Sequence, residues 1–383
     1  MLDDPKLFDR ITLEELEKTI IGEEKARRAI FLSLCSIWTI GAQVHTLVNS
    51  ESSAGKSYIC SKIRDLFPQE NYEWRTRTTP AAFTYWHNSK FEPEWSWDGK
   101  FVYLEDTSEA IINSDVFKVM CSEGSKATVV IKQRAYDIEI KGKPAMLLTT
   151  ANAFPTLEIL NRFNLITLNE TESQTQAVKE RQAQYASIWD GEKEHPTRDI
   201  FKLLQRVRVT ISFASKLPKY FPNEVRARRD FPRFLDLIKA SASLHQMQRK
   251  TNEKGVVIAE AQDYEIAREA MEYISTGVPL GLNRRQAMAW ETCKNLYDTK
   301  LLDVADKSEK EKEDIGMIGF TAREAWIENP MVSEESWKKM LDAIARRGLL
   351  TLHLSEPEGK GRPSILYSTN TNCEVSLPKF EDI

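Results

Sequence analysis

The residues whose types and spacing could do chemistry begin with Gly55-Lys56-Ser57, which ends a loop of small residues. An apolar run over 44–48 precedes the loop and is typical of a short buried strand, and a helical pattern follows it. Strand, loop and helix N-terminus together favour a phosphate cradle, in which backbone N–H groups and the positive end of the helix dipole face the anion. Lys56 would reach the β- and γ-phosphates of a nucleotide, and the Ser57 hydroxyl would ligate Mg²⁺. The other predicted nucleotide contacts are Ser50, Ser52, Ser53, Ala54, Gly55 and Tyr58.

The loop departs from the G-x-x-x-x-G-K-[ST] pattern because Ser50 stands where the first glycine belongs. The alternative interpretation is a plain helix start with a surface lysine.

A second chemical group, Glu105-Asp106, closes an apolar run over 101–104. Such a run predicts a buried parallel strand, and the carboxyl ends of these strands are where a nucleotide-binding α/β sheet places its catalytic groups. By position, Glu105 is expected to hold Mg²⁺ and Asp106 to orient the attacking water. Asp106 is one methylene shorter than the glutamate usual at that place, which shortens its reach.

Composition sets few limits on these predictions. The 383 residues leave room for two or three domains, and 41% hydrophobic with 29% charged residues is ordinary for a globular chain. No apolar run is long enough to span a bilayer, no signal sequence is legible, and the five cysteines have no paired spacing, so a cytoplasmic protein without a membrane partner is expected. A net charge of −4 means that any DNA contact must be local.

The elements that must position these residues can be placed from periodicity. Two helices are expected over 13–40, with Thr12 at the capped start and Gly22 as the break. Further strands are expected over 74–79 and 144–152, a hairpin over 128–140, and helices over 114–124, 171–186 and 199–280, the last helix beginning at 257. A charged linker is expected over 303–314, followed by helices over 321–328 and 333–347 and strands over 349–354 and 364–368.

The order of these parts resembles the AAA+ module of minichromosome-maintenance helicases. The likeness starts at Ile20-Ile-Gly-Glu-Glu and continues through the loop and the acidic strand. The hairpin resembles the pre-sensor 1 hairpin of that branch, in which Lys132 or its neighbour Arg134 would contact DNA phosphates. The aromatics over 83–99 either pack a loop onto the core or stand where those helicases insert another DNA-facing hairpin.

The same resemblance implies roles for a few more residues. Asn152 matches the sensor 1 position. The run 157–166 resembles Ser-Arg-Phe-Asp-Leu-Ile, which makes Arg162 the candidate arginine finger that reaches a neighbour's γ-phosphate. The helix that contains 226–245 resembles the sensor 2 helix, with its nucleotide-contacting arginine at either Arg229 or Arg233.

The expected fold is therefore α/β, an AAA+ P-loop domain with a parallel sheet over 1–190, an all-α lid over 191–280, and a linker with a C-terminal winged helix over 281–383. The first functional hypothesis is an ATP- and Mg²⁺-dependent, ring-forming DNA helicase or translocase in DNA replication, a compact relative of the kind that mobile elements carry. It would be a homo-oligomer, a hexamer, around single-stranded DNA, with either DNA or other replication proteins bound through the winged helix. The second is a replication initiator, loader or DNA-binding switch without unwinding, and the third a catalytically dead ring subunit.

Overall fold

The structure is a computed structural model that describes residues 1–50, 54–87, 92–121, 125–131, 134–150, 162–187, 197–221, 227–276, 284–305, 318–330, 332–346, 349–355, 364–369 and 377–383. The chain forms two compact units. Unit 1 contains Met1–Gly277 together with Ser376–Ile383, and unit 2 contains Val278–Val375.

Unit 1 is built on a five-stranded parallel sheet in the order β2-β3-β6-β1-β7. The strands are β1 (His45–Asn49), β2 (Tyr72–Arg75), β3 (Phe101–Leu104), β6 (Ala145–Thr150) and β7 (Phe163–Ile166). Every residue of β3, β6 and β7 is buried, as expected for parallel strands covered on both faces, whereas β2 lies at an edge and is half-exposed. The predicted strands before the loop and before the acid pair are confirmed.

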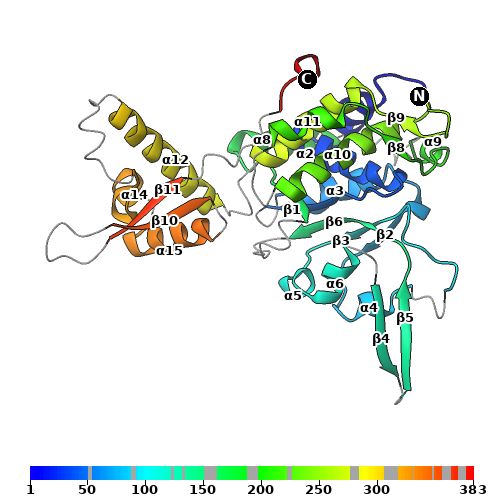
Figure 1. The fold of residues 1–383 in the computed structure, drawn as a ribbon, viewed down its shortest axis with the longest axis horizontal. Helices are drawn as coiled ribbons and strands as arrows, with labels where there is room; N and C mark the ends of the chain where they lie inside the picture. The colour runs from blue at the N-terminus through cyan, green and yellow to red at the C-terminus, as the bar shows by residue number, and fades with distance from the viewer. Residues whose placement is uncertain are drawn as a thin grey trace. The chain divides into compact units, whose positions relative to one another are not determined.

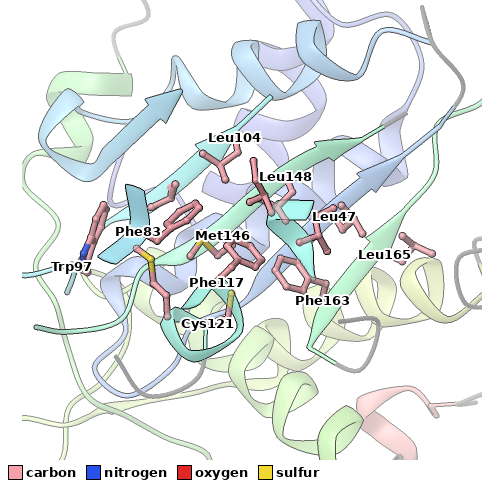
Figure 2. Packing of buried hydrophobic residues seen from close by; sticks show 14 residues of the cluster. Leu47, Phe83, Trp97, Leu104, Phe117, Cys121, Met146, Leu148, Phe163 and Leu165 are labelled. Atoms are coloured by element: carbon pink, nitrogen blue, oxygen red, sulfur yellow. The ribbon is translucent and has the colours of Figure 1, made fainter. Parts of the chain in front are cut away.

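Helices cover both faces of this sheet (Figure 1). On one face lie α2 (Glu24–Cys35), α3 (Lys56–Arg64), α10 (Ala227–Leu244) and α11 (Ala261–Thr276), and on the other α4 (Ala82–Tyr85), α5 (Glu109–Ile112) and α6 (Asp115–Met120). Figure 2 shows Leu47, Met146 and Leu148 of the strands packed against Phe83 and Phe117.

The aromatics over 83–99 belong largely to this core. Phe83 and Trp97 are fully buried, and Trp86 and Trp95 pack against them from the rim. The prediction that these aromatics pack a loop onto the core is therefore confirmed for these four rings, whereas Tyr85 is exposed and Phe91 lies outside the described residues.

The predicted hairpin is present as β4 (Ser125–Ile131) and β5 (Arg134–Ile140), which pair antiparallel from Ser125 opposite Ile140 to Ile131 opposite Arg134. The hairpin extends away from the sheet and its helices (Figure 1). Its connection, which includes Lys132, lies outside the described residues.

The predicted start of the first helix, after Thr12, was wrong. Helical turns begin at Leu7, with α1 (Leu7–Asp9), a π-helical turn (Arg10–Glu15) and a 3₁₀ turn (Leu16–Lys18). Thr12 is not a cap: it is fully buried, and its hydroxyl donates to the Phe8 carbonyl at 2.8 Å, one turn earlier. The apolar residues ahead of Thr12 are part of the same buried stripe, so the predicted helix began too late in the sequence.

Two further boundaries differ from the expectations. The edge strand β2 ends at Arg75, not at residue 79. Val257–Ile258 form strand β9, which pairs in parallel with β8 (Val209–Thr210), so α11 starts at Ala261 rather than at 257. These β-branched residues pair with a strand about fifty residues earlier in the sequence. Local helical periodicity does not reveal such a distant pairing. Among its described residues, unit 1 also contains α8 (Glu172–Ser187) and α9 (Thr197–Phe201), and α9, α10 and α11, which lie in the range predicted as a lid, belong to the same compact unit as the sheet.

Unit 2 contains α12 (Arg284–Ala305), α14 (Ala322–Glu328), α15 (Glu334–Ala345) and the antiparallel pair β10 (Leu350–Ser355) and β11 (Ser364–Thr369). The predicted helix starts are confirmed: Thr321 and Glu324 form a capping box, and Ser333 caps α15. Helix α12 was not predicted, and it includes residues 303–305, which were expected in the linker. Among the described residues, no helix has both the length and the apolar composition needed to cross a bilayer.

Candidate nucleotide-binding site

The predicted phosphate loop connects β1, which ends at Asn49, with α3, which starts at Lys56. Gly55 caps α3 with φ of +87°, a left-handed conformation that favours glycine. An added Cβ would meet open space there, so backbone conformation rather than crowding explains this glycine. The first N–H groups of α3 have no partner within the helix and, with the helix dipole, can face an anion. Ser52 and Ser53 lie outside the described residues.

The Lys56 side chain folds back over the start of this loop. Its Nζ donates to the Ser50 carbonyl at 2.8 Å, and the residue is only 5% exposed. Burial lowers the pKa of Lys56, whereas the charges of Asp106 and Glu170 oppose that shift. A bound phosphate would place negative charge next to this shielded ammonium at the helix N-terminus. That charge would favour the protonated form of the lysine, which burial disfavours.

Ser50 has a structural reason to be a serine. Its Oγ accepts from the Leu168 N–H at 2.7 Å, and both residues are buried. This hydrogen bond ties the loop to the segment that follows β7, the strand next to β1. A glycine at this position would leave the Leu168 N–H without that acceptor.

Glu170 is a site residue that the sequence did not predict. It lies two residues beyond Leu168 and acts electrostatically on Lys56. Only the pairing of β1 with β7 brings the two segments together, because parallel neighbours end at the same edge of a sheet. No spacing in the sequence signals that pairing.

The acid pair lies at the same carboxyl edge, at the end of β3, with β6 between β3 and β1. The two acids have different surroundings. Glu105 accepts from Trp74 Nε1 at 3.0 Å, toward β2. Asp106 is exposed, adopts φ of +43°, and donates its N–H to Thr149 Oγ1 at 3.1 Å. Asp106 is the member of the pair whose charge acts on Lys56.

The first residues of α3 have separate surroundings. Ser57 is partly buried, and its carbonyl accepts from the Tyr103 hydroxyl at 3.4 Å. Tyr58 is half-exposed, and its hydroxyl donates to the Thr19 carbonyl at 3.1 Å. Ser57 therefore stays at the loop, whereas Tyr58 contacts the segment before α2.

The segment before α2 also contacts the residues that follow β7. Gly22 has φ of +62°, and the carbonyl of Ile21 accepts from Gln174 Nε2 of α8 at 2.7 Å. Glu23 accepts from the Asn169 N–H at 2.7 Å. The turn over 20–23 thereby holds the segment that contains Glu170.

The predicted finger, Arg162, lies at the opposite edge of the sheet. It directly precedes β7, whose first residue Phe163 is opposite His45 at the start of β1. The strand rise places this register about 16 Å from Ser50. The charge of Arg162, after burial, helps to lower the pKa of His45 to about 4, so the two side chains are near one another.

The sensor 2 candidates occupy two environments on α10. Arg233 donates to the Phe163 carbonyl at 2.7 Å and pairs with Asp230, so it too lies at the amino edge. Arg229 is exposed. Of the other predicted residues, Arg134 is exposed at the start of β5, and Lys132 and Asn152 lie outside the described residues.

Comparison with known proteins agrees with this site. The family model of the MTBMA_p00010 P-loop domain matches residues 7–207, which is more than half of the chain and includes the whole parallel sheet with its loop. Comparison with curated proteins gives no match. The left-handed Gly55 and the shielded Lys56 fit the phosphates of a nucleotide. From the extent of the match, the chain belongs to the MTBMA_p00010 P-loop domain family.

Proposed function

We propose that the protein is an AAA+ ATPase, similar to minichromosome-maintenance helicases, that assembles into a ring and moves along DNA. The observation that carries this proposal is the separation of two charged groups. Lys56, Asp106 and the rest of the phosphate site belong to the carboxyl edge of the sheet, and Arg162 belongs to the amino edge, about 16 Å away along β1.

An arginine that stabilises a transferring phosphoryl group must approach it directly. Arg162 is too far along the strand direction to serve the loop of its own chain, so its nucleotide would be a neighbour's. Contact between the carboxyl edge of one chain and the amino edge of the next is head-to-tail, and such contacts generate rings when the rotation closes.

We assign the following roles to the chain's own residues. Lys56 would bind the terminal phosphates, and Asp106 would orient the attacking water and accept its proton. Ser57 and Glu105 are the residues that would hold Mg²⁺, which supplies neutralisation of phosphate charge when bound. Arg162 of the adjacent subunit would complete the charge balance.

The hairpin and unit 2 support a nucleic-acid partner. The β4–β5 hairpin projects from unit 1, and Arg134 is exposed beside its connection (Figure 1). Such a cation can contact DNA phosphates as a ring moves. In unit 2, α14, the capped α15 and the β10–β11 pair have the order of a winged helix, which would bind DNA or another replication protein.

The sharpest test mixes two inactive variants. Arg162→Ala is expected to bind ATP normally but to lose turnover about 10³-fold or more, and Lys56→Ala to lose ATP binding. A mixture of the two should recover part of the DNA-stimulated ATPase activity, because some interfaces pair an intact loop with an intact finger. Arg208→Ala, an exposed arginine of the same unit, is the matched control and should leave turnover unchanged. Full activity of the Arg162→Ala variant alone would refute the shared site.

A second candidate is a nucleotide switch that assembles on DNA with slow hydrolysis. The hydrogen bond from Trp74 to Glu105 favours it, because that bond occupies one carboxylate oxygen of the predicted Mg²⁺ ligand. A tailed-duplex unwinding assay separates the candidates. A switch would assemble with ATP and bind DNA but leave the duplex intact, whereas the translocase would separate its strands.

A further inference from the structure

The chain leaves unit 1 after Gly277, forms unit 2, and returns to unit 1 at Ser376. The returning segment is Leu377-Pro-Lys-Phe-Glu-Asp-Ile383, with a 3₁₀ turn at Phe380–Asp382. Figure 1 draws it in red near α11. Its contacts are with residues more than a hundred positions earlier, so nothing in its local sequence dictates where it lies.

Side chains of unit 1 bind the main chain of this segment at four successive points. The Tyr264 hydroxyl donates to the Pro378 carbonyl at 2.8 Å, and Glu265 Oε1 accepts from the Phe380 N–H at 2.6 Å. The Tyr220 hydroxyl and Lys216 Nζ donate, each at 3.2 Å, to the last two carbonyl oxygens of the segment.

One aromatic side chain anchors the segment. The Phe380 ring packs edge-on against Phe213, with ring centroids 5.0 Å apart, and tilted against Tyr264 at 5.8 Å. Leu377 is 5% exposed, whereas Lys379 and Glu381 are exposed. Main-chain hydrogen bonds with buried side chains at selected positions are how peptide-binding surfaces recognise extended ligands.

We propose that Phe213, Lys216, Tyr220, Tyr264 and Glu265 form a peptide-binding surface of unit 1, occupied within the same chain by segment 377–383. Its ligand is a short peptide that has an apolar residue and an aromatic residue three positions later and that is held through its main chain. The bound segment fixes the part of the chain that follows unit 2 to unit 1. This surface is independent of the phosphate site and of ATP hydrolysis.

The test uses the full chain and a fluorescent peptide with the sequence of residues 376–383. In the Phe380→Ala chain the intramolecular segment is weakened, so its surface should bind the peptide. In the wild-type chain the attached segment competes at a high effective concentration, so peptide binding should be at least ten-fold weaker. Lys379→Ala, a neighbouring exposed position, should behave like the wild-type chain.

Two further measurements make the test specific. A peptide that itself has alanine in place of Phe380 should bind the Phe380→Ala chain about ten-fold or more weakly than the unsubstituted peptide. Combining Tyr264→Phe with Phe380→Ala in the chain removes one hydroxyl donor and should weaken peptide binding about five-fold.

Three results would overturn the proposal. The first is equal peptide affinity for the wild-type and Phe380→Ala chains, which would place binding elsewhere. The second is no binding to the Phe380→Ala chain at any peptide concentration. The third is a mass in solution that falls on Phe380→Ala substitution, since this would show that the segment occupies a second copy rather than its own chain.

Discussion

Replacing Ser50 with glycine restores the residue that the phosphate-loop pattern calls for, yet the structure predicts that this change destabilises the protein. The Ser50 hydroxyl is the acceptor for the Leu168 N–H at 2.7 Å, and Leu168 is 6% exposed, so water has little access to replace it. Leaving such a buried donor unpaired costs about 1–3 kcal/mol. Glycine adds about 0.5–1 kcal/mol because it loses more backbone freedom on folding.

Ser50→Ala isolates the first cost, because it removes the hydroxyl and keeps the Cβ. Its free energy of unfolding in urea should fall by about 1–3 kcal/mol, and the melting temperature by about 2–4 °C per kcal/mol or somewhat less for a unit of this size. Ser50→Gly should fall further. Ser187→Ala, which removes an exposed serine hydroxyl from the end of α8, should stay within about 0.5 kcal/mol of wild type.

Substitution of Ser50 should also weaken nucleotide binding. Loss of the hydrogen bond to Leu168 loosens the segment that holds Glu170 near Lys56, so ATP affinity measured by calorimetry should fall with stability. The reasoning would be wrong if Ser50→Gly were as stable as wild type and bound ATP more tightly. That outcome would mean that the loop rearranges at no cost and that the hydrogen bond of Ser50 does not stabilise the fold.

Three more changes have expected outcomes. Asp263→Ala should cost about 3–5 kcal/mol in urea unfolding, because Asp263 is fully buried and its removal takes away the carboxylate that accepts from Arg249 Nε and Nη2, each at 2.8 Å; an effect below 1 kcal/mol would contradict this. His45 has its pKa lowered by burial from 6.5 to about 4, so its neutral form stabilises the fold above pH 6.5 and that stability is lost as the pH falls toward 4. The loss is on the order of 3 kcal/mol, and His45→Gln should show a flatter pH dependence of unfolding than wild type. Gly22→Ala should lower the melting temperature, because its Cβ would lie 2.4 Å from Gln174 Oε1 at a left-handed φ; an unchanged melting temperature would show that the turn adapts.

Much of unit 1 was predictable because its signals are local. The phosphate loop, the acidic strand and the hairpin each show a period and a boundary within about a dozen residues. The helix starts at Thr321 and Ser333 were likewise predictable from local residues, in the case of Ser333 from the acidic residues that directly follow it. In these cases the residues that form the element are the same residues that signal it.

The rest depended on contacts between distant segments. Thr12 looks like a cap until Leu7 and Phe8 are seen to be buried ahead of it. Val257–Ile258 look helical until β8 is available as a partner. The same limit applies to the site, where Glu170 becomes a neighbour of Lys56 only through the pairing of β1 with β7.

Arg162 illustrates the boundary between the two kinds of inference. Its resemblance to a finger could be read from the run 157–166, but a motif does not state the edge of the sheet at which it ends. The register of Phe163 opposite His45 fixes that edge, and parallel pairing with β1 then sets the distance from the loop at about 16 Å. This register adds a geometric condition to the proposal made from likeness. If Arg162 is a finger, it would act on the nucleotide of another subunit. The hypothesis of a shared site therefore depends on one strand register, which is a stricter basis than the motif that first suggested it.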